Sequence, residues 1–199
     1  INEEILTYIK KIGDHSFSAL AGFVASRYVG ESANSSIRGF SDNKIHSMNA
    51  GTVLNKPSED YGASTNASVL GRVTYDYQNK YLATVNFRAD GSSKFGVNNR
   101  WGHFPSFSLG WRLTGEEFMK PLDWLSDLKL RVGWGQVGND QVGYYSSYGI
   151  YGIGANYNMD GVILPGYYQS QIGNDKLRWE RTTQTNVGLD FSFLNGRMT

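Results

Sequence analysis

The segment Gly133-Trp134-Gly135-Gln136-Val137-Gly138 has the spacing G-x-G-x-x-G, which could hold a phosphate. In dinucleotide-binding proteins these glycines lead from a strand into a helix whose N-terminus contacts the phosphates. Here residues 139–144 show no apolar face with helical spacing. We therefore interpret the glycines as loop-start positions or as positions on the inner face of a strand.

Residues 156–161 read NYNMDG and resemble the first half of a calcium-binding loop. Such a loop needs a bidentate Glu at its twelfth position, where this chain has Tyr167. A turn is the favoured interpretation, and a loose ion site made of carbonyl oxygens stays open as an alternative.

Histidines are the other candidates for chemistry, and the chain has three: His15, His46 and His103. Each is expected on a different connection, and none has a partner at metal-ligand spacing. The sequence also shows no Ser/His/Asp arrangement and no pair of carboxylates suited to acid/base catalysis. We expect neither an enzyme nor a metal or cofactor site.

Tyrosines crowd one long polar connection, residues 136–176. They are Tyr144, Tyr145, Tyr148, Tyr151, Tyr157, Tyr167 and Tyr168. Aromatic rings stack on sugars or pack on partner proteins, and their hydroxyl groups form hydrogen bonds. The same rings could instead pack the connection against itself. These tyrosines are candidates for ligand or partner binding, with self-packing as the alternative.

Strict alternation of apolar and polar residues dominates two segments, residues 81–90 and 106–113. Such period-two alternation predicts strands with one apolar and one polar face. The polar face carries Arg, Asn and Gly, as if it met water, whereas the apolar face carries large aromatic and aliphatic side chains, as if it met lipid. This combination is typical of the wall of a membrane β-barrel.

The same alternation predicts seven strands and one incomplete hairpin. The strands are expected at residues 5–12, 17–29, 67–77, 81–90, 107–113, 128–134 and 182–193. Short connections near Asp14, Asn79 and Asn195-Gly196 alternate with long ones near residues 40, 95 and 155, as in outer-membrane barrels. One helical turn is expected at residues 116–120. The predicted fold is all-β: an antiparallel transmembrane β-barrel, present as a partial wall of about seven to eight strands.

Two sets of side chains should therefore face opposite ways. Those expected to face lipid are Val73, Tyr75, Val85, Phe87, Leu109, Trp111, Leu130, Val132, Leu189 and Phe191. Those expected to face the interior are Arg72, Thr74, Asn86, Arg88, Arg112, Arg131, Asn186 and Asp190. The four arginines could shape substrate preference, but pairing with carboxylates is the favoured role. Tyr75, Tyr77 and Tyr81, at one short turn, fit an aromatic girdle at the membrane interface.

Composition narrows the possible classes. The 199 residues carry a formal charge of +1 and no basic stripe, so nucleic acid is not an expected partner. With no cysteine, disulfides are excluded. The mean hydropathy is −0.42 and no apolar run approaches the ~18 residues of a spanning helix. The alternative to a barrel is a secreted or surface carbohydrate-binding β-sandwich with Tyr-rich hairpins.

Ordered motifs from about residue 66 onward resemble the SusC/RagA family of TonB-dependent transporters in the outer membrane of Bacteroidetes. They are LGRVTYDY at 70–77, RADGSSKFG at 88–96, NNRWGHFPS at 98–106, GWR at 110–112, EFM at 117–119, LSDLKLR at 125–131, GN at 138–139, LRWE at 177–180 and TTQTNVGLDF at 182–191.

The resemblance implies an outer-membrane importer of glycans or oligopeptides, powered through TonB and capped by a SusD/RagB-like surface lipoprotein. Family members also have a signal peptide, a plug, a TonB-contacting segment and more barrel strands, which we do not find in this chain. Residues 1–199 are therefore expected to be one segment of the β-barrel domain of such a receptor. Its long loops would meet the lipoprotein or the ligand.

Overall fold

The computed structural model describes residues 1–193 apart from positions 43, 46 and 123. The chain divides into two compact units, one made of residues 27–64 and the other of residues 1–26 and 65–199. His46 and the expected hairpin at Asn195-Gly196 lie outside the described residues.

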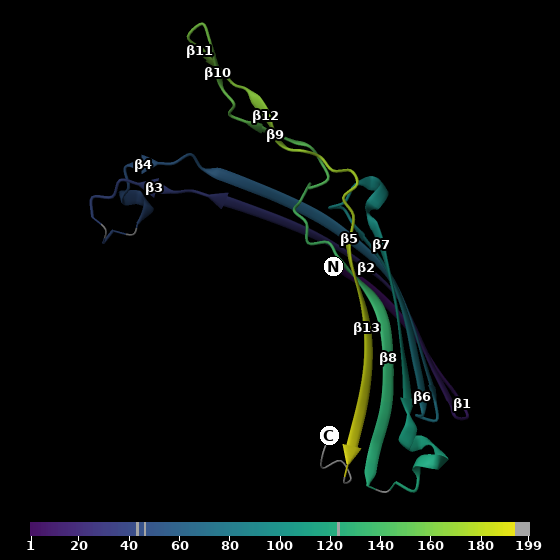
Figure 1. Ribbon diagram of the computed structural model, residues 1–199. Helices are drawn as coiled ribbons and strands as arrows, with labels where there is room; N and C mark the ends of the chain where they lie inside the picture. Colours follow the sequence, from purple (N-terminus) through teal and green to yellow (C-terminus); the bar gives the residue numbers. More distant parts are fainter. Residues whose placement is uncertain (43, 46, 123, 194–199) are drawn as a thin grey trace. The chain divides into compact units, whose positions relative to one another are not determined.

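Seven strands form one antiparallel sheet in the order β1-β2-β5-β6-β7-β8-β13 (Figure 1). They are β1 (Asn2–Ile12), β2 (His15–Asn34), β5 (Ser58–Tyr77), β6 (Tyr81–Ser92), β7 (Trp101–Arg112), β8 (Leu125–Asn139) and β13 (Glu180–Phe193). Among the described residues, β1 pairs only with β2, and β13 only with β8. The seven expected strands are confirmed, and the sheet they form is not closed.

Most strands are longer than the alternation indicates. β5 begins at Ser58 rather than at residue 67, and β8 continues to Asn139 rather than ending at residue 134. At these ends the apolar face is no longer maintained, so periodicity could not detect the continued strand.

The strand register separates the two expected sets of side chains. Arg72 lies opposite Asn86, which lies opposite Ser106, whereas Val73 lies opposite Val85, which lies opposite Phe107. Leu109 pairs with Val132, and Leu130 with Leu189, so the apolar face continues across β7, β8 and β13. Each set therefore shares one face of the sheet, and the assignment of these faces to lipid and interior stays a prediction.

The apolar face is uncovered. Val85 is 58% exposed and Val187 is 73% exposed, although both lie in the middle of paired strands. Among the described residues, Phe95 and Phe104 are the only buried hydrophobic side chains. A β-sandwich would bury such a face against a second sheet, but the other sheets of the described chain have only two strands each. The β-sandwich alternative is therefore wrong.

The turn between β5 and β6 shows why this hairpin is so short. Gln78 and Asn79 have φ of +51° and +54°, and Lys80 N donates to the Tyr77 carbonyl at 2.9 Å. Asp76 Oδ1 accepts a hydrogen bond from Asn79 N at 2.8 Å. Two central residues with positive φ are the geometry that matches the twist of paired strands.

The long polar connection from β8 to β13 contains two short pairs of strands that the sequence analysis did not predict. β9 (Ile150–Ile153) pairs with β12 (Tyr167–Gln171), and β10 (Tyr157–Met159) pairs with β11 (Val162–Leu164). Asp160 and Gly161, at φ +50° and +83°, form the turn between β10 and β11, where half a calcium loop was considered. These strands are three to five residues long, too short to show a period in the sequence.

Other connections between the strands of the main sheet contain short strands or 3-10 turns. In the unit of residues 27–64, β3 (Ile37–Arg38) pairs with β4 (Val53–Leu54), and η1 (Met48–Ala50) lies between them in sequence. After β7 come the 3-10 turns η3 (Leu113–Gly115) and η4 (Glu117–Met119), which match the helical turn expected at 116–120; η2 (Val97–Asn99) precedes β7. Among the described residues, no helix is long and apolar enough to cross a membrane.

Candidate functional site

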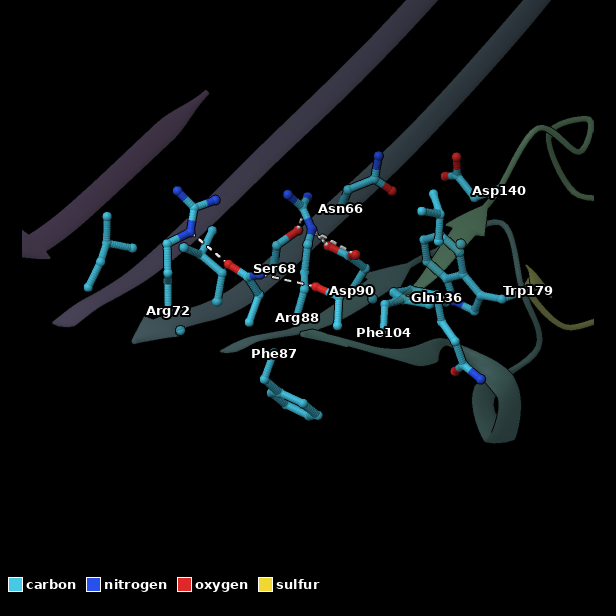
Figure 2. Close-up of a pocket in the computed structure, with 18 of the residues that line it drawn as sticks. Asn66, Ser68, Arg72, Phe87, Arg88, Asp90, Phe104, Gln136, Asp140 and Trp179 are labelled. Carbon is cyan, nitrogen blue, oxygen red and sulfur yellow. Dashed lines mark hydrogen bonds and ion pairs between the residues drawn. The ribbon is translucent and has the colours of Figure 1, made fainter. Parts of the chain in front are cut away.

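A hollow of about 690 Å³, lined by polar and apolar side chains, lies at the face of β5 to β8 that carries Arg72 and Arg88 (Figure 2). Arg88 Nε donates to both carboxylate oxygens of Asp90, at 2.7 and 2.8 Å, and Arg88 Nη2 donates to Ser68 Oγ at 3.2 Å. Figure 2 shows Arg72 and Arg88 projecting to one side of the sheet and Phe87 to the other. The alternation of the strands therefore places a hydrogen-bonded polar lining on one face only.

The four arginines of this face are held by neighbouring strands. Arg131 Nε lies 2.6 Å from Asp190 Oδ2, and Arg112 Nε lies 3.3 Å from Asp127 Oδ1. Arg72 differs from the others, because its Nε donates to the amide oxygen of Asn86 at 2.7 Å. Among the described residues it has no carboxylate partner. Three of these four arginines are thus paired with a carboxylate, and the charge of Arg72 is not matched by one within the described part of the chain.

The G-x-G-x-x-G segment lies within β8 and forms no phosphate loop. Gly138 is at the end of the hollow, where a Cβ atom would overlap the ring of Phe104. Phe104 in turn packs edge-on against Trp179 at 5.5 Å between ring centroids. The glycine is required here by close packing with an aromatic ring, which the motif alone could not reveal.

The seven candidate tyrosines fall in two groups. Tyr144, Tyr145 and Tyr148 lie in the turns that follow β8, whereas Tyr151, Tyr157, Tyr167 and Tyr168 lie on the short hairpins. Tyr151 and Tyr167 are 69% and 73% exposed. The ring of Tyr168 covers Gly152 on the paired strand, where a Cβ would come within 2.8 Å of it. Self-packing therefore accounts for Tyr168, and it leaves Tyr151 and Tyr167 available to a partner.

Aromatic side chains gather at the short-turn end of the apolar face. Tyr81 stacks on Trp111 at 6.4 Å and on Tyr77 at 6.2 Å, and His15 Nδ1 lies 2.9 Å from the Tyr75 hydroxyl. Such a row of rings is typical of an interfacial girdle. The sequence indicated the three tyrosines, but Trp111 and His15 join them only through pairing between strands.

Glu116 anchors this girdle from the turn after β7. Its Oε1 accepts hydrogen bonds from the Tyr81 hydroxyl at 2.6 Å and from Trp111 Nε1 at 3.2 Å, and Lys80 Nζ lies 3.5 Å from its Oε2. The hydrogen bonds from Tyr81 and Trp111, together with the charge of Lys80, hold the pKa of Glu116 below its usual value. Sequence reasoning missed Glu116 because Tyr81 is 35 residues away in sequence.

The histidines serve packing in the part of the chain that the structure describes. His103 stacks on Phe87 at 6.0 Å. No group of three or more His, Cys, Asp or Glu side chains able to hold a metal ion occurs among the described residues. What the described site offers is therefore binding by hydrogen bonds, paired charges and aromatic rings.

A protein-family model described as TonB dependent receptor-like, beta-barrel matches residues 7–199. The chain belongs to this family. The strands of a β-barrel in a membrane alternate apolar and polar side chains, which explains why the sheet has one uncovered apolar face and one hydrogen-bonded polar face.

Relatives of this barrel segment include the TonB-dependent receptor SusC of Bacteroides thetaiotaomicron. The two are 37% identical over 205 residues, which cover 96% of this chain and 19% of SusC. The TonB-dependent receptor P39 of Formosa agariphila is 37% identical over 200 residues, covering 99% of this chain and 19% of the relative. The chain thus spans about a fifth of the length of these relatives.

Among solved structures, the RagAB peptide transporter is similar to this segment with a TM-score of 0.84 and 29% identity. The similarity covers 98% of this chain and 22% of the compared chain. The resemblance to the SusC/RagA family is confirmed.

Proposed function

We propose that this chain forms part of the barrel wall of an outer-membrane importer that takes up glycans or oligopeptides, driven through TonB. The observation that carries the proposal is the seven-stranded sheet with one exposed apolar face and one hydrogen-bonded polar face, in a chain related to SusC and to the RagAB peptide transporter. The mechanism is transport, and no bond of the substrate is made or broken.

The polar face would line the passage. A wall of unmatched cations would trap anionic substrates, whereas Arg88, Arg112 and Arg131 are neutralised by Asp90, Asp127 and Asp190. The terminal guanidinium nitrogens of Arg72 are available for a carboxylate, either on the substrate or on a plug. Serine, asparagine and glutamine side chains around it offer neutral hydrogen bonds that suit sugars and peptide groups.

Residues 141–173, which we call the arm, would contact a SusD/RagB-like lipoprotein. Asp160 is the only charged residue in the arm, which carries all seven candidate tyrosines. Ile153 and Ile163 are 71% and 70% exposed on the same hairpins. Exposed aliphatic and aromatic groups of this density suit a protein interface better than a sugar site, which needs more hydrogen-bonding side chains. TonB would act through a part of the protein outside this chain.

Uptake is tested by deleting the gene for the full-length transporter and growing the bacterium on single oligosaccharides and on oligopeptide mixtures. We expect growth to be lost on at least one of these nutrients and restored by the intact gene. Undiminished growth on all of them, at limiting concentrations, would contradict the proposal.

The arm is tested in the full-length transporter by replacing Tyr151 and Tyr167 with Ser and measuring co-purification of the SusD/RagB-like lipoprotein. Losing two exposed rings from an interface should weaken binding by about 10-fold or more. Val97→Ser is the control, because Val97 is an exposed apolar residue just before β7 and outside the arm. Equal co-purification in all three proteins would leave self-packing as the role of the tyrosines.

A further inference from the structure

We propose that residues 92–100, which we call the clamp, hold both roots of the arm and so determine where the arm is presented. The clamp is the connection between β6 and β7, and its SSKFG segment belongs to one of the two nine-residue motifs noted above. The proposal concerns the position of the arm, and its consequence for the lipoprotein rests on the proposed function.

The first root is Asp140, directly after β8. Ser92 Oγ donates to Asp140 Oδ2 at 3.0 Å, and Lys94 Nζ donates to the Asp140 carbonyl at 3.1 Å. Lys94 Nζ also lies 3.8 Å from Asp140 Oδ2 and 5.9 Å from the ring centroid of Tyr144. Both charged side chains are mostly buried, at 18% and 26% exposure. One lysine of the clamp therefore contacts the root and the first tyrosine of the arm.

The second root is the segment 174–179, which leads from the arm into β13. Asn99 Nδ2 donates to the Asp175 carbonyl at 2.8 Å, and Trp179 Nε1 donates to the Arg100 carbonyl at 2.8 Å. Gly96 approaches the same backbone so closely that a Cβ would lie 2.9 Å from the Asp175 oxygen. The clamp thus binds this root by backbone contact as well as by side chains.

A small apolar core lies between the clamp and the second root. Phe95 is 0% exposed and packs against Trp179 at 5.2 Å between ring centroids, and Phe104 also packs against that indole. In the described chain these two phenylalanines are the only buried hydrophobic side chains. A barrel wall in lipid needs no such core, so its location at Trp179 of the second root indicates that it serves the arm.

The clamp is itself fixed to the sheet. Ser93 N donates to the Thr65 carbonyl at 2.9 Å, and Thr65 N donates to Ser93 Oγ at 2.9 Å. Within the clamp, Ser92 N donates to the Arg100 carbonyl at 3.1 Å and so joins its two ends. The arm is therefore tied through the clamp to β5, whereas its own polypeptide connects only to β8 and β13.

The two chain segments at the base of the arm are also joined to each other by hydrogen bonds. Gln171 Nε2 donates to the carbonyls of Tyr145 at 3.1 Å and Tyr148 at 2.9 Å. A flexible segment would lose conformational entropy on binding a partner. An arm held at both roots has lost much of that entropy before binding, so the clamp residues that contact the roots are positioning residues for whatever the arm contacts. Val97 is not one of them, since its side chain is 74% exposed.

The test uses the full-length transporter with spin labels on Cys replacing Ile163, an exposed residue of the arm, and Val137, an exposed residue of β8. The distance distribution between the labels is measured by pulsed electron paramagnetic resonance. Phe95→Ala removes the apolar core, and Lys94→Met keeps the stem of the side chain but removes its contacts with Asp140. We expect each to broaden the distribution roughly twofold. Val97→Ala in the same loop should leave it unchanged.

Heat-modifiable gel mobility identifies variants whose barrel is folded, and only these are scored. If Phe95→Ala fails to fold, Lys94→Met decides the result. An unchanged distribution in the scored variants overturns the proposal, whereas broadening supports it. Co-purification of the lipoprotein should fall ~10-fold in the broadened variants. If the distribution broadens and the lipoprotein still binds as in the wild type, the positioning role of the clamp is supported and the proposed partner of the arm is wrong.

Discussion

At the scale of residues, Glu116 shows how one carboxylate organises the short-turn end of the sheet. It accepts hydrogen bonds from a tyrosine of β6 and a tryptophan of β7, and it pairs with Lys80 in the preceding turn. Aromatic rings at an interface need a partner for their polar atoms. Glu116 provides one acceptor for two rings and so fixes the girdle to the turn.

The lowered pKa of Glu116 predicts a pH dependence. Its pKa is lower in the folded than in the unfolded protein, so its contribution to stability is complete above the unfolded value and is lost as the pH falls through the folded value. We expect the wild type to unfold at a higher temperature than Glu116→Gln at neutral pH, in detergent, with intrinsic tryptophan fluorescence as the measurement. The difference should vanish in acid. A difference that stays constant as the pH falls would contradict this role, because the amide side chain of the variant cannot titrate.

At the scale of elements, each strand separates two environments. Val85 lies in the middle of β6 between Val73 and Phe107, and Thr84 next to it faces the opposite side, between Thr74 and Ser108. The face of Thr84 also carries the hydrogen bonds that join Arg72, Asn86 and Ser106. The strand thus separates an apolar from a polar face, and its register decides which side chains share each face.

A pair of neighbouring substitutions tests this boundary. Val85→Arg would place a charge on the lipid face and should lower the free energy of unfolding by about 2–4 kcal/mol near the bilayer midplane. Thr84→Arg is the matched control on the polar face, with an expected change of about 1 kcal/mol or less. Urea unfolding of the full-length transporter in lipid vesicles measures both. Equal losses in the two variants would be inconsistent with a lipid-facing Val85.

At the scale of the whole molecule, the sheet has two edges. Among the described residues, β1 and β13 each pair on one side only. In lipid an unsatisfied backbone group costs several kcal/mol, so spanning sheets are closed. Since the chain spans about a fifth of the length of its relatives, we expect strands outside it to pair with β1 and β13.

This expectation can be measured with the segment itself. Residues 1–199, refolded in detergent, should show no heat-modifiable gel mobility and no stable conductance in planar bilayers, because seven strands leave both edges open. The full-length transporter in the same detergent is the control for folding. A closed, conducting pore formed by the segment alone would refute the need for further strands.

The sequence by itself determined the two faces of the wall, because period-two alternation is a local signal and lipid makes it strong. It also determined the seven strands of the main sheet and the Gln78-Asn79 turn, and its ordered motifs indicated the family. The ends of the strands were predicted less well. β5 begins at Ser58, but its first residues do not continue the apolar face, so the alternation could not reveal them.

Only the tertiary structure decided what lies at the two ends of the sheet. Trp179 meets the carbonyl of Arg100 across 79 residues, and Tyr81 meets Glu116 across 35. No local period encodes such contacts, since they depend on which strands become neighbours. The arm's strands have only three to five residues, too few to show a period, so only the structure showed that they pair as hairpins.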